Sequence, residues 1–441
     1  MSHSIPQING EKSYFLYSDP IATQSKFIKT FHLPKVNKLS NFKIRYNLFN
    51  QINCNPIYGD TLKLKTVKNA IEKIDLNVWT KTRKHINVYE SPNEWDPSPV
   101  SGNSATGTLN VTVKSKYKLK HVSRAYYKLL EMLTDFKISC NSKTLHACES
   151  PGGFIEATID YKSIHSSFIS DCYTFSLYSD SDYDIPIYST KLLNNNFVKI
   201  LSKTSKDDSP HSCSGNSSNF SNGKGNCNGD ITDLSVLLKL YSKLKNEKIS
   251  FITADGGIPD KSLFNKKEIL HINLIICEIF LGLLVLEESG SFILKVFDLF
   301  LDSTVSMLYL LSYLFETVSI TKPLTSRSTN SEKYIVCKGY HKNLFTTTIK
   351  NNLIKIISKN KGILVYLDTV DILKIETIFE DIDPEFVNSI KMYNQMYTEN
   401  QISNISYTLD YITAGPFEED NNIRKKNKKK LIKEWKTLYY I

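Results

Sequence analysis

The feature that most constrains this chain is the segment LHACESPGGFIE at residues 145–156. An apolar run ends at Cys148, a Pro-Gly-Gly turn follows, and an apolar-periodic stretch continues to Tyr161. This order predicts a β-strand, a tight turn and an α-helix. Glycine in the turn allows positive φ and a close approach to a ligand, and the first turn of a helix has unpaired N–H groups. The segment therefore predicts a site for a nucleotide-like or carboxylate-bearing cofactor, unless Pro-Gly-Gly serves only as a turn.

Strands and helices alternate around this segment. Further strands are expected near residues 168–177, 249–254, 291–297 and 333–339, and helices near 123–133, 233–245, 263–287 and 303–315. Alternation of this kind builds βαβ units. We therefore predict an α/β fold with a parallel sheet and helices on both of its faces.

The most apolar stretch, residues 269–286, is long enough to raise the question of a membrane span. It contains His271, Asn273 and Glu278, which favour a buried core helix, and we predict no membrane partner. The eight cysteines include no CxxC pair, so the sequence indicates neither a zinc site nor a disulfide framework. We expect reduced thiols in an intracellular protein.

Composition divides the 441 residues into three regions. We predict an N-terminal extension with a linker at 1–112, a core domain at 113–342 and a C-terminal extension at 343–441. Within the core, residues 202–229 are rich in Ser, Asn and Gly and are predicted to be a flexible insertion.

The formal net charge of +10 is consistent with a polyanionic partner. The basic run at 424–430 is either a solvated, disordered tail or a segment for nuclear import or phosphate contacts. In the N-terminal extension, aromatic residues such as Trp79 and Tyr89 lie among basic ones. That arrangement occurs both in nucleobase stacking and in ordinary packing, and the extension is a candidate for RNA or cap contacts.

Three charged residues stand out by position in the predicted strands. Asp255 ends one strand before Gly-Gly, Lys295 interrupts the apolar strand 292–297, and Glu332 precedes the last strand. A lysine within a core strand is costly unless it is paired, and a carboxylate at a strand end is typical of sites in open α/β sheets. The three residues form either a buried ion-pair network or an active site, and the Pro-Gly-Gly segment on the same sheet favours the site.

Six strings carry a resemblance to a known family. They are SRAYYKL at 123–129, PGGF at 151–154, GDIT at 229–232, ADGG at 254–257, FILKVFDLF at 292–300 and SRSTNSEKYIVCKG at 326–339. Together they resemble the FtsJ-type RNA 2′-O-ribose methyltransferases, in particular their cap-specific eukaryotic and viral branch. The resemblance implies a Rossmann-like methyltransferase fold. Its sheet would have seven strands, mostly parallel with one antiparallel strand, helices on both faces, and N- and C-terminal extensions added to it.

The resemblance also implies a catalytic tetrad, Lys128, Asp255, Lys295 and Glu332. In this chemistry a ribose 2′ oxygen attacks the sulfonium methyl of S-adenosylmethionine in line, and a positioned base helps because an alcohol is a poor nucleophile. We predict that Lys295 is the base, which requires a pKa depressed from ~10.4. Lys128, which by itself reads as a surface charge, would orient the hydroxyl, with Asp255 and Glu332 holding the lysines. No metal is needed.

Other site residues follow from the same resemblance. The implied cofactor-binding residues are Ser123, Glu149, Ser150, Pro151, Gly152, Gly153, Phe154, Ile155, Asp230 and Asp255. Candidate substrate-binding residues are Asn265, Arg327 and Asn330. The family often has an acidic residue where this chain has His146, so either Glu149 is the carboxylate for the methionine amino group or this carboxylate is absent.

We therefore expect a cap-specific mRNA 2′-O-methyltransferase that uses S-adenosylmethionine and binds capped mRNA, with other capping or transcription proteins as further partners. The alternatives are an rRNA or tRNA 2′-O-methyltransferase and a non-catalytic RNA-binding subunit of a capping complex. The long flanks favour the cap branch, and the complete tetrad argues against a non-catalytic subunit. We expect an intracellular location, in the nucleus for a cellular eukaryotic enzyme and in the cytoplasm or virion for a viral one.

Overall fold

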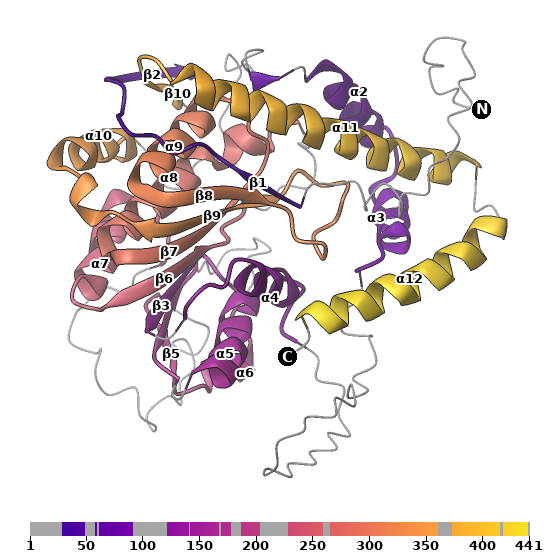
Figure 1. The fold of residues 1–441 in the computed structure, drawn as a ribbon, viewed down its shortest axis with the longest axis horizontal. Coiled ribbons are helices and arrows are strands. Elements are labelled where there is room, and N and C mark those ends of the chain that lie inside the picture. Colours follow the sequence, from indigo (N-terminus) through magenta and orange to yellow (C-terminus); the bar gives the residue numbers. More distant parts are fainter. Residues whose placement is uncertain are drawn as a thin grey trace.

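The computed structural model describes residues 29–48, 58–59, 61–90, 121–140, 142–166, 169–177, 187–202, 228–258, 265–359, 373–414 and 418–439. An eight-stranded sheet lies at its centre, in the order β1-β8-β9-β7-β6-β3-β4-β5 (Figure 1). Its strands are β1 (Thr30–His32), β3 (Lys143–Ala147), β4 (Cys172–Phe175), β5 (Val198–Ile200), β6 (Ile249–Ala254), β7 (Leu286–Val296), β8 (Phe315–Thr321) and β9 (Lys333–Tyr340).

Most of the sheet is parallel. Strands β7, β6, β3, β4 and β5 all run in one direction, β9 is antiparallel to β7, and β8 is antiparallel to β9. The seven strands from β3 to β9 confirm the predicted fold class. The eighth, β1, comes from the N-terminal extension and pairs antiparallel with β8, so two strands rather than one oppose the rest.

Helices cover both faces of the sheet, and alternate residues of its strands point to the two sides. In β7, Phe292 and Leu294 pack with α8 and α9, whereas Ile293 packs with α4 and α5. The helices of the core are α4 (Ala125–Asp135), α5 (Gly153–His165), α6 (Thr190–Leu193), α7 (Leu234–Leu244), α8 (Lys267–Val285), α9 (Asp302–Leu314) and α10 (Thr347–Ile357). In the described part of the chain, α8 is the one helix apolar and long enough to cross a membrane, but 89% of its apolar window is buried, as in a core helix.

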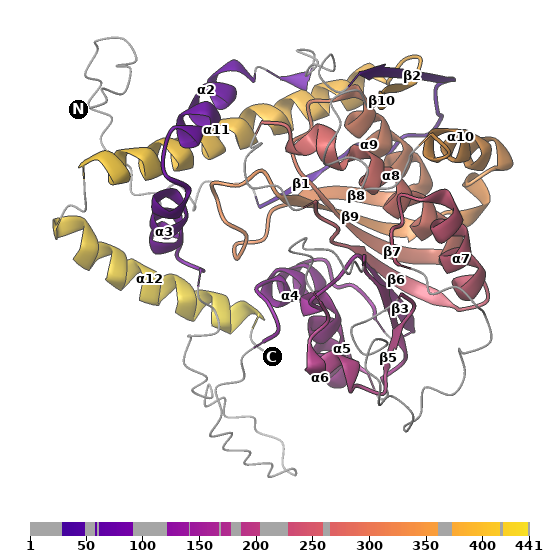
Figure 2. The ribbon, with the colours of Figure 1, turned by 180° about the vertical axis from the view of Figure 1, so that it is seen from behind.

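The N- and C-terminal extensions pack on the core and on each other. Strand β2 (Phe42–Leu48) pairs with β10 (Leu373–Phe379), and the long helix α11 (Pro384–Ala414) lies along α2 (Leu62–Glu72) and α3 (Leu76–Ile86) (Figure 2). The Asn394 side chain of α11 donates hydrogen bonds to the carbonyl oxygens of Tyr58 (2.6 Å) and Leu299 (2.8 Å). The predicted boundaries near 112 and 342 therefore separate stretches of sequence that share one packed body.

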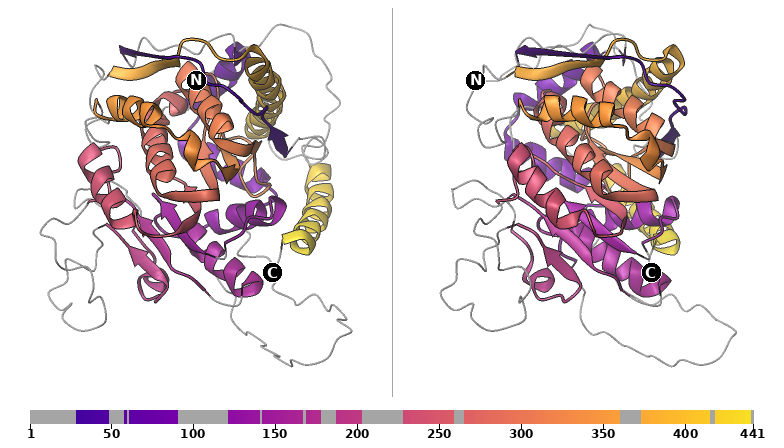
Figure 3. Two further views of the ribbon diagram at one scale, coloured as in Figure 1. Left: turned by 60° about the vertical axis from the view of Figure 1, so that its left-hand side comes forward. Right: turned by 90° about the vertical axis from the view of Figure 1, so that its left-hand side faces the viewer.

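Two predictions about the flanks need correction. The basic run 424–430 lies within helix α12 (Glu418–Tyr439), so a disordered tail is wrong; Trp435 of this helix is buried beside Tyr127 of α4. Figure 3 shows α12, in yellow, beside the α4 side of the molecule. Trp79 and Tyr89 are also buried, so both are packing residues rather than stacking platforms. Most of the predicted insertion 202–229 lies outside the described residues, as do residues 91–112 at the end of the predicted extension and linker.

Candidate active site

The turn between β3 and α5 can be built only with glycine. Gly152 has φ +107°, and a Cβ on it would lie 1.9 Å from the Leu192 side chain. A Cβ on Gly153 would lie 2.2 Å from the Ser123 hydroxyl, which accepts the Ala125 N–H at 3.2 Å. The loop therefore brings its backbone close to its neighbours, as a phosphate- or cofactor-binding turn does.

Two of the residues assigned to the cofactor loop point into the protein. The side chains of Phe154 and Ile155 are fully buried in separate apolar clusters, one on α4 and one on α6. Only their backbone atoms are in a position to serve a ligand.

Glu149 lies at the start of the same turn and is buried. Its Oε1 accepts the Phe154 N–H at 2.7 Å, while its Oε2 is buried without a hydrogen-bond partner in the described structure. Burial and the nearby Asp255 carboxylate raise the pKa of Glu149 well above its ordinary value. A bound ammonium group would satisfy this orphaned oxygen, so the residue fits the amino group of a methionine-type cofactor.

His146, which occupies the family's usual acidic position, serves the sheet interior instead. Its ring lies between the hydroxyls of Thr144 (3.1 Å) and Thr253 (2.8 Å). Burial and Lys162 lower the pKa of His146 to about 3, so it is neutral. Of these two residues, only Glu149 presents a carboxylate at the loop.

Asp230 lies at the same edge of the sheet, ahead of α7. Its Oδ1 accepts the N–H (3.0 Å) and hydroxyl (2.6 Å) of Thr232. Ser176, at the end of β4, binds the Ser150 N–H at 2.8 Å. A Cβ on Gly229, which has φ +76°, would lie 2.0 Å from the Ser176 carbonyl. Ser150 and Asp230 are therefore held at the carboxyl ends of adjacent strands.

The four predicted catalytic residues come together as two ion pairs. Lys128 Nζ lies 2.6 Å from Glu332 Oε1, and Lys295 Nζ lies 3.2 Å from Asp255 Oδ1. Lys295 also donates to the Asp255 carbonyl at 2.6 Å. The four residues come from α4, the end of β6, β7 and the residue before β9.

Tyr334 joins the two pairs, and the sequence interpretation missed it. Its hydroxyl lies 3.1 Å from Asp255 Oδ1 and 3.4 Å from Glu332 Oε1. A tyrosine within an apolar strand has no signal of its own. Its position two residues after Glu332, on the same face of an extended chain, could have indicated it.

The charges of the tetrad differ from expectation in one respect. Burial alone would lower the pKa of Lys295, but the carboxylates of Asp255 and Glu332 outweigh it and raise this pKa above the ordinary value. The predicted depressed pKa is therefore wrong for the protein by itself. Glu332 remains ionised, because Lys128, Lys295 and Lys322 hold its pKa far below the usual range in spite of its burial.

A further carboxylate, which the sequence interpretation took only as a sign of a buried helix, lies behind the Asp255 loop. Glu278 of α8 accepts the Gly256 N–H at 3.0 Å through Oε1, and its buried Oε2 has no hydrogen-bond partner in the described structure. Burial raises the pKa of Glu278 to about 8. An ionisable side chain in the middle of so apolar a helix was a usable signal.

Two of the three candidate substrate residues share one turn, in which the Asn330 N–H donates to the Arg327 carbonyl at 3.2 Å, while the third, Asn265, makes no hydrogen bond with them in the described structure. Lys322 donates to the side-chain oxygen of Asn330 at 2.7 Å, so that side chain is held by the protein. Arg327 pairs with Glu90, 2.8 Å from Nε to Oε2, and Asn265 with Asn69. No contact among the described residues tests their assignment to a substrate.

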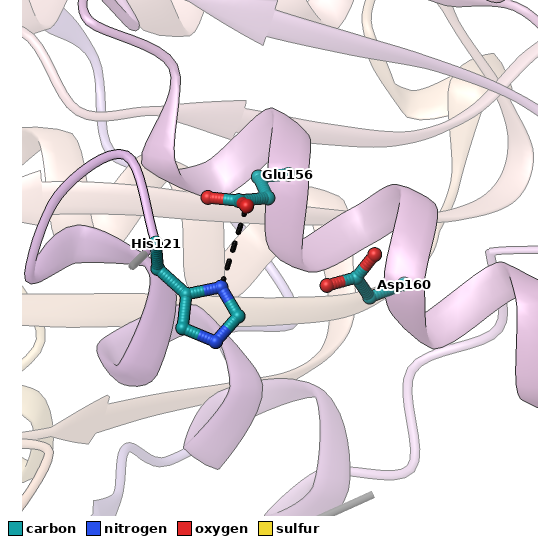
Figure 4. A group of neighbouring side chains, drawn as sticks. All are labelled: His121, Glu156 and Asp160. Atoms are coloured by element: carbon teal, nitrogen blue, oxygen red, sulfur yellow. Dashed lines mark ion pairs between the residues drawn. The ribbon is translucent and has the colours of Figure 1, made fainter. Parts of the chain in front are cut away.

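A separate group of metal-ligand types lies on the outer side of α5 (Figure 4). Ligand atoms of His121, Glu156 and Asp160 lie within 4.8 Å of one another. Glu156 is paired with His121 (3.3 Å) and with Lys191, and Tyr126 donates to Asp160 at 3.1 Å. These partners explain the group as a clamp that holds the chain before α4 onto α5.

Comparison with known proteins places these features in a family. The profile of the FtsJ-like methyltransferases matches residues 121–340. A protein of African swine fever virus named "Probable methyltransferase EP424R" is 31% identical over 310 residues, which cover 67% of this chain and 69% of that protein.

Two further relatives are named cap-specific mRNA (nucleoside-2′-O-)-methyltransferase 1. The Caenorhabditis elegans protein is 29% identical over 206 residues, or 45% of this chain, and the human protein is 36% identical over 129 residues, or 28% of this chain. The matches span only 22% and 15% of those two proteins.

Among solved structures, a ribosomal RNA methyltransferase of Plasmodium falciparum is 19% identical to this chain. The match covers 49% of this chain and 97% of that one, with a TM-score of 0.34. The family profile spans the whole of the site described above, and the viral relative is similar over two thirds of both chains. The chain belongs to the FtsJ-like methyltransferase family.

Proposed function

We propose that this protein is an S-adenosylmethionine-dependent methyltransferase that acts on the ribose 2′-hydroxyl of an RNA nucleotide next to an mRNA cap. The observation that carries the proposal is the pair of ion pairs, Lys128–Glu332 and Lys295–Asp255, joined by Tyr334. Both pairs lie at the sheet edge where the Pro-Gly-Gly loop turns.

The residues at the loop fit the cofactor. The orphaned Oε2 of Glu149 suits an ammonium group, and the backbone of Gly152 and Gly153 allows close approach. Ser150 and Asp230 are held at adjacent strand ends, where the nucleoside portion of such a ligand binds in open α/β sheets. When bound, S-adenosylmethionine supplies an electrophilic methyl group on a positively charged sulfur.

The tetrad orients the RNA 2′-hydroxyl and accepts the proton that the hydroxyl loses. Lys128 and Lys295 present ammonium groups whose positions are set by Glu332 and Asp255, so the hydroxyl oxygen meets preorganised donors. To accept the proton, Lys295 must lose its own, and its pKa is raised in the protein alone. A cation bound beside Lys295 shifts that pKa downward, so we assign the base role to the complex and not to the free protein.

The choice of a cap-proximal nucleotide rests on the relatives. The nematode and human proteins are named for cap-specific 2′-O-methylation. The tetrad by itself is equally suited to any RNA ribose.

The test is methyl transfer from labelled S-adenosylmethionine to matched RNAs. Short RNAs with a 5′ cap, short RNAs without it and structured rRNA or tRNA transcripts should be compared, with Lys295→Ala as the inactive control. Strong preference for the capped RNA is expected. Equal transfer to capped and uncapped RNA would contradict cap specificity, and a preference for the structured transcripts would favour an rRNA or tRNA methyltransferase. Absence of transfer to every RNA would reject the activity.

A further inference from the structure

Three arginines gather around one carboxylate beside the tetrad. Arg83 of α3, Arg124 before α4 and Arg327 of the loop after β8 all interact with Glu90. Glu90 Oε2 lies 3.0 Å from Arg124 Nη1 and 2.8 Å from Arg327 Nε. Both of these arginines therefore share the single acid, and the cluster retains positive charge.

Arg83 is the least compensated member of the cluster. Its Nε is buried and has no acceptor in the described structure. The Nε of Arg124 is also buried without an acceptor, although its Nη2 donates to the Thr325 carbonyl at 2.6 Å. An unpaired guanidinium donor in a partly buried site is costly, and a bound anion would remove that cost.

Repulsion between the positive charges of the cluster also indicates that a bound anion would be favourable. Burial, followed by the charge of Arg327, lowers the pKa of Arg83 to about 10, in spite of Glu90. Lys267, at the start of α8, also has a lowered pKa, from burial and then from Arg83. The cluster is therefore a region of positive charge that an anion would stabilise.

The cluster borders the tetrad on two sides. Arg124 lies one helical turn before Lys128, and Arg327 belongs to the loop that ends at Glu332. Lys267 interacts with Arg83 and also with Glu332. The side chains of Arg124 and Arg327 are each 23% exposed, and Arg83 is partly exposed, so a ligand can reach the cluster from solvent.

We propose that Arg83, together with Arg327, binds a phosphate group of the RNA beside the nucleotide to be methylated. Guanidinium groups match phosphate oxygens in charge and in planar, bidentate geometry. The inference rests on the proposed function and extends it. Arg83 lies outside the matched residues 121–340, so the N-terminal extension would supply part of the substrate site.

The experiment compares Arg83→Gln with Lys84→Gln, which removes the same charge from an exposed position on the same helix. We expect Arg83→Gln to bind a short capped RNA about tenfold more weakly, and the slope of log affinity against log salt to fall by about 1. Lys84→Gln should stay within about twofold of wild type. Both variants should bind S-adenosylmethionine as wild type does. The melting temperature of Arg83→Gln should not fall, because the substitution relieves repulsion.

Neutral phosphate analogues locate the contact. In RNAs with one methylphosphonate placed in turn at each linkage near the target nucleotide, one position should weaken wild-type binding about tenfold and leave Arg83→Gln unaffected. Arg83→Gln and Lys84→Gln with equal RNA affinity would overturn the phosphate site. The phosphate site would also be overturned if Arg83→Gln had a lower melting temperature than wild type and if a methylphosphonate weakened wild-type binding equally at every linkage. If wild type transfers no methyl group to the unmodified RNA, the proposed function fails first and this assignment with it.

Discussion

Lys128 Nζ lies 2.6 Å from Glu332 Oε1, although the two residues are 204 positions apart in the chain. This ion pair joins helix α4, which precedes the Pro-Gly-Gly loop, to the loop that precedes strand β9. Through Tyr334 it is connected to the Lys295–Asp255 pair. Each pair restrains the other, which is the geometric condition for a preorganised site.

Replacement of Lys295 tests the base. Lys295→Ala should abolish methyl transfer while S-adenosylmethionine affinity stays within a few-fold, because the amine is proposed to act on the RNA hydroxyl and not on the cofactor. Lys295→Arg should be almost as inactive, since a guanidinium does not deprotonate. Single-turnover transfer and calorimetric cofactor binding measure the two quantities. Activity of either variant within about tenfold of wild type would remove Lys295 from the mechanism.

Tyr334→Phe tests the link between the ion pairs. Loss of the hydroxyl leaves both pairs in place but frees Asp255 and Glu332 to move, so kcat should fall about tenfold. The free energy of unfolding should change by only about 1 kcal/mol. Val336→Ala, in the same strand and apolar cluster, is the control for packing alone. If Tyr334→Phe has full activity, the hydroxyl plays no part in positioning.

Glu278 should make the protein less stable as pH rises. Its pKa is raised by burial from 4.5 to about 8, so the folded state holds a proton that the unfolded state releases. The stability from that proton is complete below about pH 4.5 and is lost as pH rises to about 8, at about 1.4 kcal/mol per pH unit between them. Glu278→Gln removes this titration. Urea unfolding at pH 5.5 and 7.5 should show a smaller difference for the variant, and an unchanged difference would contradict the assignment.

Substitutions in helix α12 should show separately what its buried tryptophan contributes to stability and what its lysines contribute to RNA binding. Trp435 is 1% exposed against the cluster that contains Tyr127, so Trp435→Ala should cost about 3–5 kcal/mol. Lys429 and Lys430 are exposed on the same helix. Their joint replacement by Gln should keep stability within about 0.5 kcal/mol and weaken binding to any RNA at low salt. The ratio of capped to uncapped activity should not change, and a lowered ratio would show that the helix recognises the cap.

Gly152→Val should destabilise the Pro-Gly-Gly loop for two reasons that can be tested separately. The new Cβ meets the Leu192 side chain, and φ of +107° is strained for any residue other than glycine. We expect weaker S-adenosylmethionine binding and a loss of stability of about 1–3 kcal/mol. Adding Leu192→Ala removes the clash but not the strain, so the double variant should regain only part of the affinity. Unchanged affinity in Gly152→Val would place the cofactor elsewhere.

Local pattern was sufficient for the central elements. The strand–turn–helix at 145–156, the alternation of strands and helices and the tetrad positions could be predicted because periodicity, turn chemistry and family strings are carried by neighbouring residues. The structure retains these elements, with β3, α5, β6, β7 and β9 near the expected positions.

Short or isolated elements could not be predicted in the same way. Strand β1 has three residues and exists because Phe31 pairs with Ile320, a contact between distant parts of the chain. Strand β8 follows α9 without a break and has no turn signal to announce it. The burial of Trp79 and Trp435 likewise depends on which distant helix covers each of them.

The order of the main elements and the glycine turn could be predicted from the sequence alone, because both depend on near neighbours in the chain, and the resemblance to a family indicated the four charged residues. The protonation and pairing of these charged residues depend on the tertiary structure. The closeness of Lys295 to Asp255 and Glu332 sets the direction of its pKa shift, and the sharing of Glu90 by Arg124 and Arg327 leaves Arg83 the least compensated of the three arginines. Electrostatic energy depends on separation and burial in space, and neither can be obtained from spacing along the chain.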